Sequence, residues 1–330
     1  MYPIYFFYYI SQLIYTAKCK LNKSEQWAIT YMRQLEQKYD GHFNDAIIQK
    51  VARFQSIQLH FIANTFSGLF NRQNNPSETE CNMDYFLMTV LYDALIDEEK
   101  VSETHLNDLF YHTATTTPAN FNESVLVAIH LKLLDKVTDK DGYWKIIESV
   151  HLAQKDSSSQ FENGLSIEHI VDITKRKGGF SLLMCRYYLI DPTYNSLDNC
   201  WYHLGGLIQM TNDLYDTYKD SQSNIHTFAT KLKSIEAIKE IYNQQKHLFN
   251  TSIKALPISR QRKLIFAIKT AVIGAFGDIA IQQLSKLQTN QGELPNLKIV
   301  PRAKLIIDME KRKNQFKLIR YAYKNGKRWM

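Results

Sequence analysis

Apolar residues recur along this chain three or four positions apart, and the long segments show no sustained alternation of apolar and polar residues. Between 43 and 71, for example, Ile47, Val51 and Phe54 fall on one side of a 3.6-residue repeat. This period over segments of such length is typical of amphipathic α-helices and not of strands. The pattern therefore predicts an all-α fold.

Proline and glycine are scarce and lie mostly between the periodic segments, so they mark the expected ends of helices. We find no linker and expect one helical domain over 1–330, a single large bundle around a central apolar pocket. In this domain, N-terminal helices (1–40) pack on the body, and a basic helix and tail (301–330) close the chain. The expected helices cover roughly 3–17, 23–39, 43–71, 80–98, 102–113, 122–138, 141–160, 166–190, 194–220, 226–250, 258–288 and 301–323.

Gly178 and Gly179 lie inside one of these helical patterns, directly after Lys175, Arg176 and Lys177. Each glycine inside a helix costs roughly 1 kcal/mol relative to alanine, so the pair needs a structural reason. It predicts either a break in the helix or a close approach of two backbones, with three cations beside that point.

The net charge of +7 permits an anionic partner, and three classes fit: nucleic acid, an acidic membrane surface or a phosphorylated small molecule. The chain has no recognised nucleic-acid module, so we expect no nucleic acid partner. It also lacks a P-loop, a G-x-G-x-x-G loop and an H-E-x-x-H motif. Its four cysteines have no metal-site spacing and are typical of free thiols in the cytoplasm.

The two ends of the chain have unusual compositions. The N-terminal segment from Tyr2 to Tyr15 is rich in aromatic residues but is too short to span a bilayer and lacks the features of a signal peptide. We expect it to pack as a helix on the body, with contact to a membrane interface as the lesser alternative, and we expect no other segment to span. The basic run that begins at Lys311 is a solvated helix end or, alternatively, a contact to anionic lipid.

Asn212, Asp216 and Asp220 step by four residues through a segment whose flanking positions are apolar. On a helix they share one face, so oxygen ligands form a stripe along a helix that otherwise suits a core. Carboxylates stacked beside a core are unfavourable unless something compensates their charge, and a cation is the simplest compensation.

Asp93 and Asp97 form a similar pair about 120 residues earlier, on the face that Phe86 and Val90 define. Alone, this pair also fits a solvated helix end. If the two helices face each other, however, they place acid on two walls of one cavity. Mg²⁺ takes one or two protein carboxylates and completes its shell with water and phosphate oxygens, so such a cavity suits a diphosphate ester.

The run QMTNDLYDTYKD (209–220) resembles the second metal motif of class I isoprenoid (terpene) synthases. It is similar to Q-x-T-N-x-x-R-D-x-x-x-D of squalene and phytoene synthases and to N-D-x-x-S-x-x-x-E of terpene cyclases. The run DALIDE (93–98) resembles their first motif, D-D-x-x-D-E, with Ala94 in place of the second Asp. The order and spacing agree over 45–290, and the chain is similar to bacterial enzymes of the tetraprenyl-curcumene synthase type.

This resemblance implies an isoprenoid synthase fold and a prenyl diphosphate substrate. It implies three Mg²⁺ ions bound together with the diphosphate, and catalytic metal ligands at Asp93, Asp97, Asn212, Asp216 and Asp220. It further implies basic groups that bind the diphosphate, for which the candidates are Lys177, Arg186 and Arg176. Lys177 is favoured because it lies beside the glycine pair, whereas Arg186 also suits a structural ion pair.

The leading hypothesis is a Mg²⁺-dependent class I terpene synthase, a lyase that ionises its substrate and directs cyclisation or elimination. A prenyltransferase that couples two prenyl diphosphates is the alternative, although Tyr215 replaces the Arg of squalene and phytoene synthases. A non-catalytic helical protein that binds a prenyl lipid is the third. We expect a cytoplasmic protein, with peripheral membrane contact and a homodimer both left open.

Overall fold

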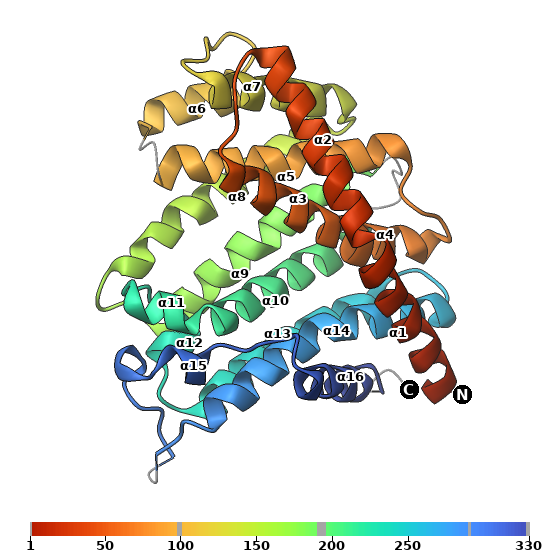
Figure 1. Ribbon diagram of the computed structural model, residues 1–330, viewed down its shortest axis with the longest axis vertical. Coiled ribbons are helices and arrows are strands. Elements are labelled where there is room, and N and C mark those ends of the chain that lie inside the picture. The colour runs from red at the N-terminus through yellow and green to blue at the C-terminus, as the bar shows by residue number, and fades with distance from the viewer. Residues whose placement is uncertain (1, 98–100, 190–195, 290–291, 328–330) are drawn as a thin grey trace. The chain divides into compact units, whose positions relative to one another are not determined.

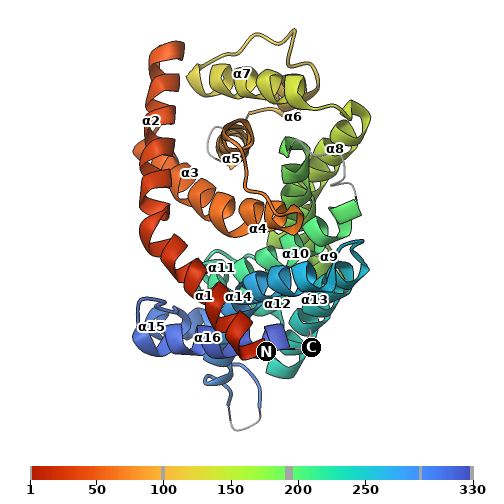
Figure 2. The same cartoon turned by 90° about the vertical axis from the view of Figure 1, so that its right-hand side faces the viewer.

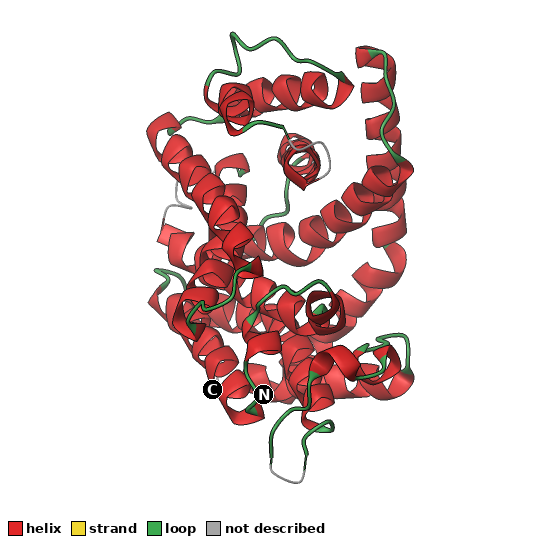
Figure 3. Cartoon of the chain, turned by 90° about the vertical axis from the view of Figure 1, so that its left-hand side faces the viewer, coloured by secondary structure: helices red, strands yellow, loops and turns green. Residues whose placement is uncertain are grey.

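The computed structural model describes residues 2–97, 101–189, 196–289 and 292–327, and for Asp97 it describes the backbone alone. Within these ranges the regular structure is helical, and the all-α prediction is confirmed (Figure 3). The β pairing that these residues contain is one isolated bridge between Ser234 and Glu293.

The chain divides into two compact units, each with its own internal packing. Unit 1 comprises Met1–Tyr9, Trp144–Arg186 and Asp191–Met330, and unit 2 comprises Ile10–Tyr143 and Tyr187–Ile190. Three elements cross the boundary between the units: α1 (Tyr2–Cys19), α8 (Lys140–Ser157) and the 3-10 helix η4 (Cys185–Tyr188). A single domain over the whole chain stays a prediction.

Unit 2 is organised around α5, which packs against α3 and α7 (Figure 2). Its helices are α2 (Leu21–Tyr39), α3 (Asp45–Ile57), the π-helix η1 (Gln58–Ala63), α4 (Asn64–Ser67), the 3-10 helix η2 (Gly68–Phe70), α5 (Pro76–Asp97), α6 (Glu103–Tyr111) and α7 (Phe121–Lys136). The expected helix over 43–71 is therefore helical from 45 to 70, with one π-helical segment inside it.

Buried acids in unit 2 are neutralised within the fold. Asp84 of α5 is fully buried, with Lys132 Nζ 2.6 Å from its Oδ2 and the Tyr31 hydroxyl donating to its Oδ1 at 2.5 Å. Glu78 is fully buried as well and accepts two hydrogen bonds of 2.7 Å from Arg72. A buried carboxylate is costly without such partners. The contacts of Asp84 join α5 to α2 and α7, and the Arg72–Glu78 pair joins α5 to the loop before it.

Unit 1 is organised around α10, which packs against α9, α13 and α14 (Figure 1). Its remaining elements are η3 (Ser158–Phe161), α9 (Ile167–Met184), α10 (Asp198–Tyr215), α11 (Thr217–Gln222), α12 (Phe228–Lys231), α13 (Ile235–Ala255), α14 (Arg260–Ser285), η6 (Leu297–Ile299), α15 (Arg302–Leu305) and α16 (Arg312–Lys327). By length and composition α14 could cross a membrane, which corrects the expectation that no segment could, and 56% of its apolar window is buried inside the protein.

Of the two explanations for the glycine pair, a helix break is wrong and a close approach of two backbones is confirmed. Helix α9 continues through Gly178 and Gly179 without a break. A Cβ on Gly178 would lie 2.4 Å from the carbonyl oxygen of Gly205 on α10, and a Cβ on Gly205 would lie 2.1 Å from that of Gly178. The two helix backbones are therefore in direct contact, which glycine alone permits.

The expected helix over 194–220 is two helices. α10 ends at Tyr215 and α11 begins at Thr217, with Asp216 between them at φ −85° and ψ 5°. At the N-terminus, Tyr2 is buried and its hydroxyl donates to the carbonyl oxygen of Tyr323 on α16 at 3.0 Å. The start of α1 therefore packs on α16 within unit 1.

The Gly178–Gly205 contact makes a testable prediction. Replacing Gly205 with alanine forces α9 and α10 apart, and we expect the free energy of unfolding to fall by about 1–3 kcal/mol, the usual cost of overpacking. Gly68→Ala is the matched control, because a Cβ there meets nothing within 4 Å. Thermal unfolding followed by circular dichroism measures both variants, and equal stability of the two would contradict the contact.

Candidate active site

The second acidic stripe lies where α10 ends and α11 begins. Asn212 and Asp216 are exposed, whereas Asp220 is buried, with 7% of its surface accessible. The amide of Asp216 donates to the carbonyl oxygen of Asn212 at 2.8 Å, and the amide of Asp220 donates to that of Asp216 at 2.8 Å. The four-residue steps therefore keep their helical register across the junction.

Asp213 is an acid of this site that the sequence analysis did not select. It is buried, and its Oδ1 accepts a hydrogen bond from Gln209 Nε2 at 3.1 Å while its Oδ2 accepts one from Thr174 Oγ1 at 3.0 Å. Gln209 and Asp213 are also four residues apart, and they lie on the side of α10 that meets α9. This second four-residue step is visible in the sequence, one position along from the step between Asn212 and Asp216.

The acids at this junction lack full compensation of their charge. Burial raises the pKa of Asp213 to about 6, against the hydrogen bonds from Gln209 and Thr174. Burial also raises the pKa of Asp220 to about 7, and the neighbouring Asp213 and Asp216 raise it further. Among the described residues, no side chain donates a hydrogen bond to the Asp220 carboxylate, in contrast to Asp84 and Glu78 of unit 2.

These residues fit a hard divalent cation in chemistry. Carboxylate and amide oxygens are its preferred ligands, and added positive charge would relieve the repulsion among Asp213, Asp216 and Asp220. Within the described ranges, no three His, Cys, Asp or Glu side chains gather closely enough to hold a metal ion. Mg²⁺ usually takes only one or two carboxylates and leaves its other positions to water and phosphate oxygens.

Two of the basic candidates lie near this junction on α9. Lys177 is half-buried, and its Nζ donates to Ser157 Oγ at 3.4 Å. Its charge lowers the pKa of both Asp213 and Asp220, so Lys177 acts electrostatically on these acids. Arg176, by contrast, forms ion pairs of 2.7 Å with Asp156 and with Asp172, so its guanidinium is already neutralised.

Arg186 lies elsewhere. Helices α9 and α10 are antiparallel, since Thr174 meets Asp213 while Arg186 Nε lies 2.9 Å from Asp198 Oδ1 at the start of α10. At 1.5 Å per helical residue, Asp198 is roughly 27 Å from Asp216. This position does not favour the predicted role of Arg186 in binding a diphosphate held at Asp216, and it matches the structural ion pair that was the alternative.

The first acidic pair belongs to α5. Asp93 is partly exposed, and its charge contributes to the raised pKa of Tyr92, after burial and Tyr111. Asp97 is the last residue of α5, and its side chain lies outside the described part of the chain. Because Asp93 is in unit 2 and Asp216 in unit 1, the facing of the two acidic clusters stays a prediction.

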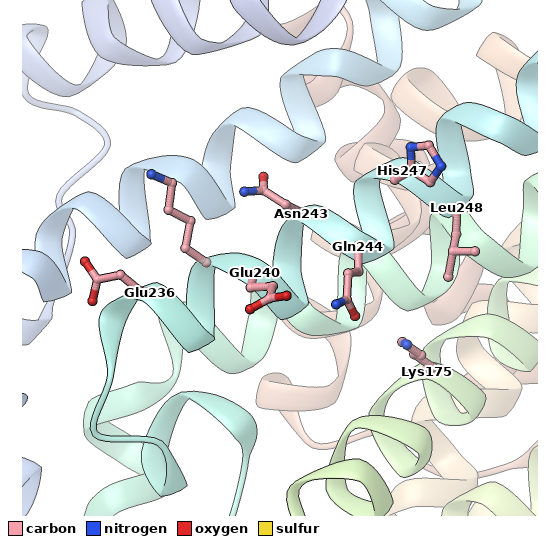
Figure 4. A pocket seen from close by; sticks show the side chains of 8 residues that line it. Lys175, Glu236, Glu240, Asn243, Gln244, His247 and Leu248 are labelled. Carbon is pink, nitrogen blue, oxygen red and sulfur yellow. The ribbon is translucent and has the colours of Figure 1, made fainter.

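A groove of about 660 Å³ lies along α13 (Figure 4). Its lining comes from one side of α13 and from Lys175 of α9, and comprises Lys175, Glu236, Lys239, Glu240, Asn243, Gln244, His247 and Leu248. These side chains are mostly charged or polar, and none of them is a predicted catalytic residue. The groove is therefore not the expected apolar pocket, which stays a prediction.

Comparison with known proteins does not identify a family for this chain. No model of a protein family matches the chain, and no curated protein matches it. The assignment therefore depends on the residues themselves and on their resemblance to the two metal motifs.

The raised pKa of Asp220 makes a prediction about pH. Between about pH 4 and pH 7 the folded protein keeps a proton on Asp220 that the unfolded chain has lost, so stability falls as pH rises through this window. Asp220→Asn should remove this loss and raise stability at pH 8, relative to pH 5, by on the order of 1–3 kcal/mol. Thermal unfolding with a chelator present measures the effect. Asp141→Asn, at an exposed acid, is the control, and an unchanged pH profile in Asp220→Asn would contradict the assignment.

Proposed function

We propose that this protein is a Mg²⁺-dependent class I terpene synthase that ionises a prenyl diphosphate and directs the carbocation to cyclise or eliminate. The observation that carries the proposal is the Asn212/Asp216/Asp220 ladder at the α10–α11 junction. Burial and neighbouring carboxylates raise the pKa of Asp220, and the charge of Lys177 opposes that rise.

Each residue of the junction has a role in this proposal. Oxygens of Asn212, Asp216 and Asp220 hold the cation, and Mg²⁺ bound there would neutralise the diphosphate and make it a better leaving group. Lys177 reaches the same place from α9 and donates hydrogen bonds to phosphate oxygens, as charged donors do most strongly. Asp213 accepts hydrogen bonds from Gln209 of α10 and Thr174 of α9, so it connects the two helices. Its charge also adds to the negative potential at Asp220.

Tyr215 favours cyclisation or elimination over head-to-head coupling. Squalene and phytoene synthases carry Arg at the matching place of the motif. Here Tyr215 is half-buried, its hydroxyl donates to Met309 Sδ at 3.4 Å, and burial raises its pKa. It therefore offers no cation to a second diphosphate.

Asp216→Asn tests the proposal, because it removes one charge and keeps the shape of an exposed side chain. With Mg²⁺ and prenyl diphosphates of increasing chain length, we expect diphosphate release and a hydrocarbon product from the wild type. The variant should lose on the order of 100-fold in turnover, as other losses of an electrostatic catalytic group do. Colorimetry of released diphosphate and mass spectrometry of products measure both, with Asp141→Asn as the matched control.

The other outcomes distinguish the alternatives. A product with the carbon atoms of two substrates would indicate a prenyltransferase. Binding of a prenyl diphosphate without its cleavage would indicate the non-catalytic protein. If no chain length is turned over and no diphosphate binds in the presence of Mg²⁺, the assignment of the ladder is wrong.

A further inference from the structure

Helix α16 presents one strongly cationic side to solvent. At 100° per residue its basic side chains fall within an arc of roughly 140°. These residues, the cationic face, are Arg312, Lys313, Lys317, Arg320, Lys324 and Lys327. Phe316 lies inside the same arc and is 72% exposed, while Ala322 and Gly326 on the other side are buried.

The cationic face is not neutralised by the protein. In the part of the chain that the structure describes, none of its six side chains forms an ion pair. Repulsion is evident at Lys317, whose pKa is lowered by burial and then by Lys286 and Lys313. The face therefore has free capacity for an anionic partner.

An exposed apolar patch borders this face. The first turns of α1 bury Tyr2 and Phe6 against Tyr323 of α16, with ring centroids 5.2 and 5.1 Å from that of Tyr323. The opposite side of the same turns exposes three large side chains, which we call the apolar patch: Ile4 (76% exposed), Phe7 (59%) and Tyr8 (57%). The Phe7 ring also stacks on Tyr323 at 6.4 Å, so the patch adjoins α16 directly. All these residues belong to unit 1.

We propose that the apolar patch and the cationic face of α16 together form a docking surface for an anionic lipid bilayer. Basic side chains are drawn to anionic headgroups, and Phe, Tyr and Ile side chains gain by leaving water at the headgroup boundary. A nucleic acid would satisfy the cations but leave Ile4 and Phe7 in water. A second copy would bring the six cations against one another. This surface is independent of the acids at the α10–α11 junction and of the function proposed for them.

Sedimentation of the protein with vesicles tests this surface. We expect binding to phosphatidylcholine vesicles that contain phosphatidylserine, little binding to phosphatidylcholine alone, and weaker binding as salt increases. The combined variant Arg320→Gln, Lys324→Gln, Lys327→Gln should bind on the order of 100-fold more weakly, at about fivefold for each charge. Loss of the same number of charges in Lys50→Gln, Lys136→Gln, Lys140→Gln, all exposed in unit 2, should have little effect.

A second variant tests the contribution of the exposed apolar side chains to vesicle binding. Ile4→Ser with Phe316→Ser changes two highly exposed side chains, so the fold should survive. We expect vesicle binding to weaken about tenfold or more, since both apolar side chains would leave water on docking. Unchanged binding in this variant, together with tight binding to an oligonucleotide, would overturn the proposal in favour of nucleic acid. If the two charge variants lose vesicle binding equally, net charge alone explains the binding and the proposal is overturned. If the protein is a dimer that the Ile4→Ser, Phe316→Ser variant dissociates, the surface belongs to a contact with a second copy.

Discussion

The backbone contact between α9 and α10 decides the geometry of the candidate site. Because Gly178 and Gly205 carry no side chains, the two helices meet closely and in one register. That register sets Thr174 against Asp213 and brings Lys177 within electrostatic reach of Asp213 and Asp220. It also carries the C-terminal end of α9 away from the junction of α10 and α11.

Buried acids have two different situations in this protein. Asp84 and Glu78 of unit 2 are each held by a basic side chain and further donors, as the burial of charge requires. Asp220 of unit 1 is nearly as buried, yet among the described residues no basic side chain forms an ion pair with it. Burial raises its pKa, Asp213 and Asp216 raise it further, and Lys219 and Lys177 oppose that rise. An acid that the fold leaves in this state suits a bound cation better than a structural role.

Unit 1 therefore contains uncompensated charge of both signs, acid at the α10–α11 junction and base on α16. If both proposals hold, the two sites suit one substrate, because a prenyl diphosphate has an anionic head and a chain that partitions into membranes. A protein docked on anionic lipid would take up such a substrate where it is concentrated. The two sites can still be tested separately, since the substitutions on α16 change none of Asn212, Asp216 and Asp220.

The helical nature of the chain followed from its sequence, because a 3.6-residue period and capping residues such as Asn120, Ser166 and Ser259 act within a few positions. The Asn212/Asp216/Asp220 ladder followed for the same local reason. Only the tertiary structure decided that the glycine pair packs against α10, that Arg176 and Arg186 pair with acids, and that Asp213 is buried. Those outcomes depend on which residue of a partner helix lies opposite, and that register comes from packing between segments distant in the chain.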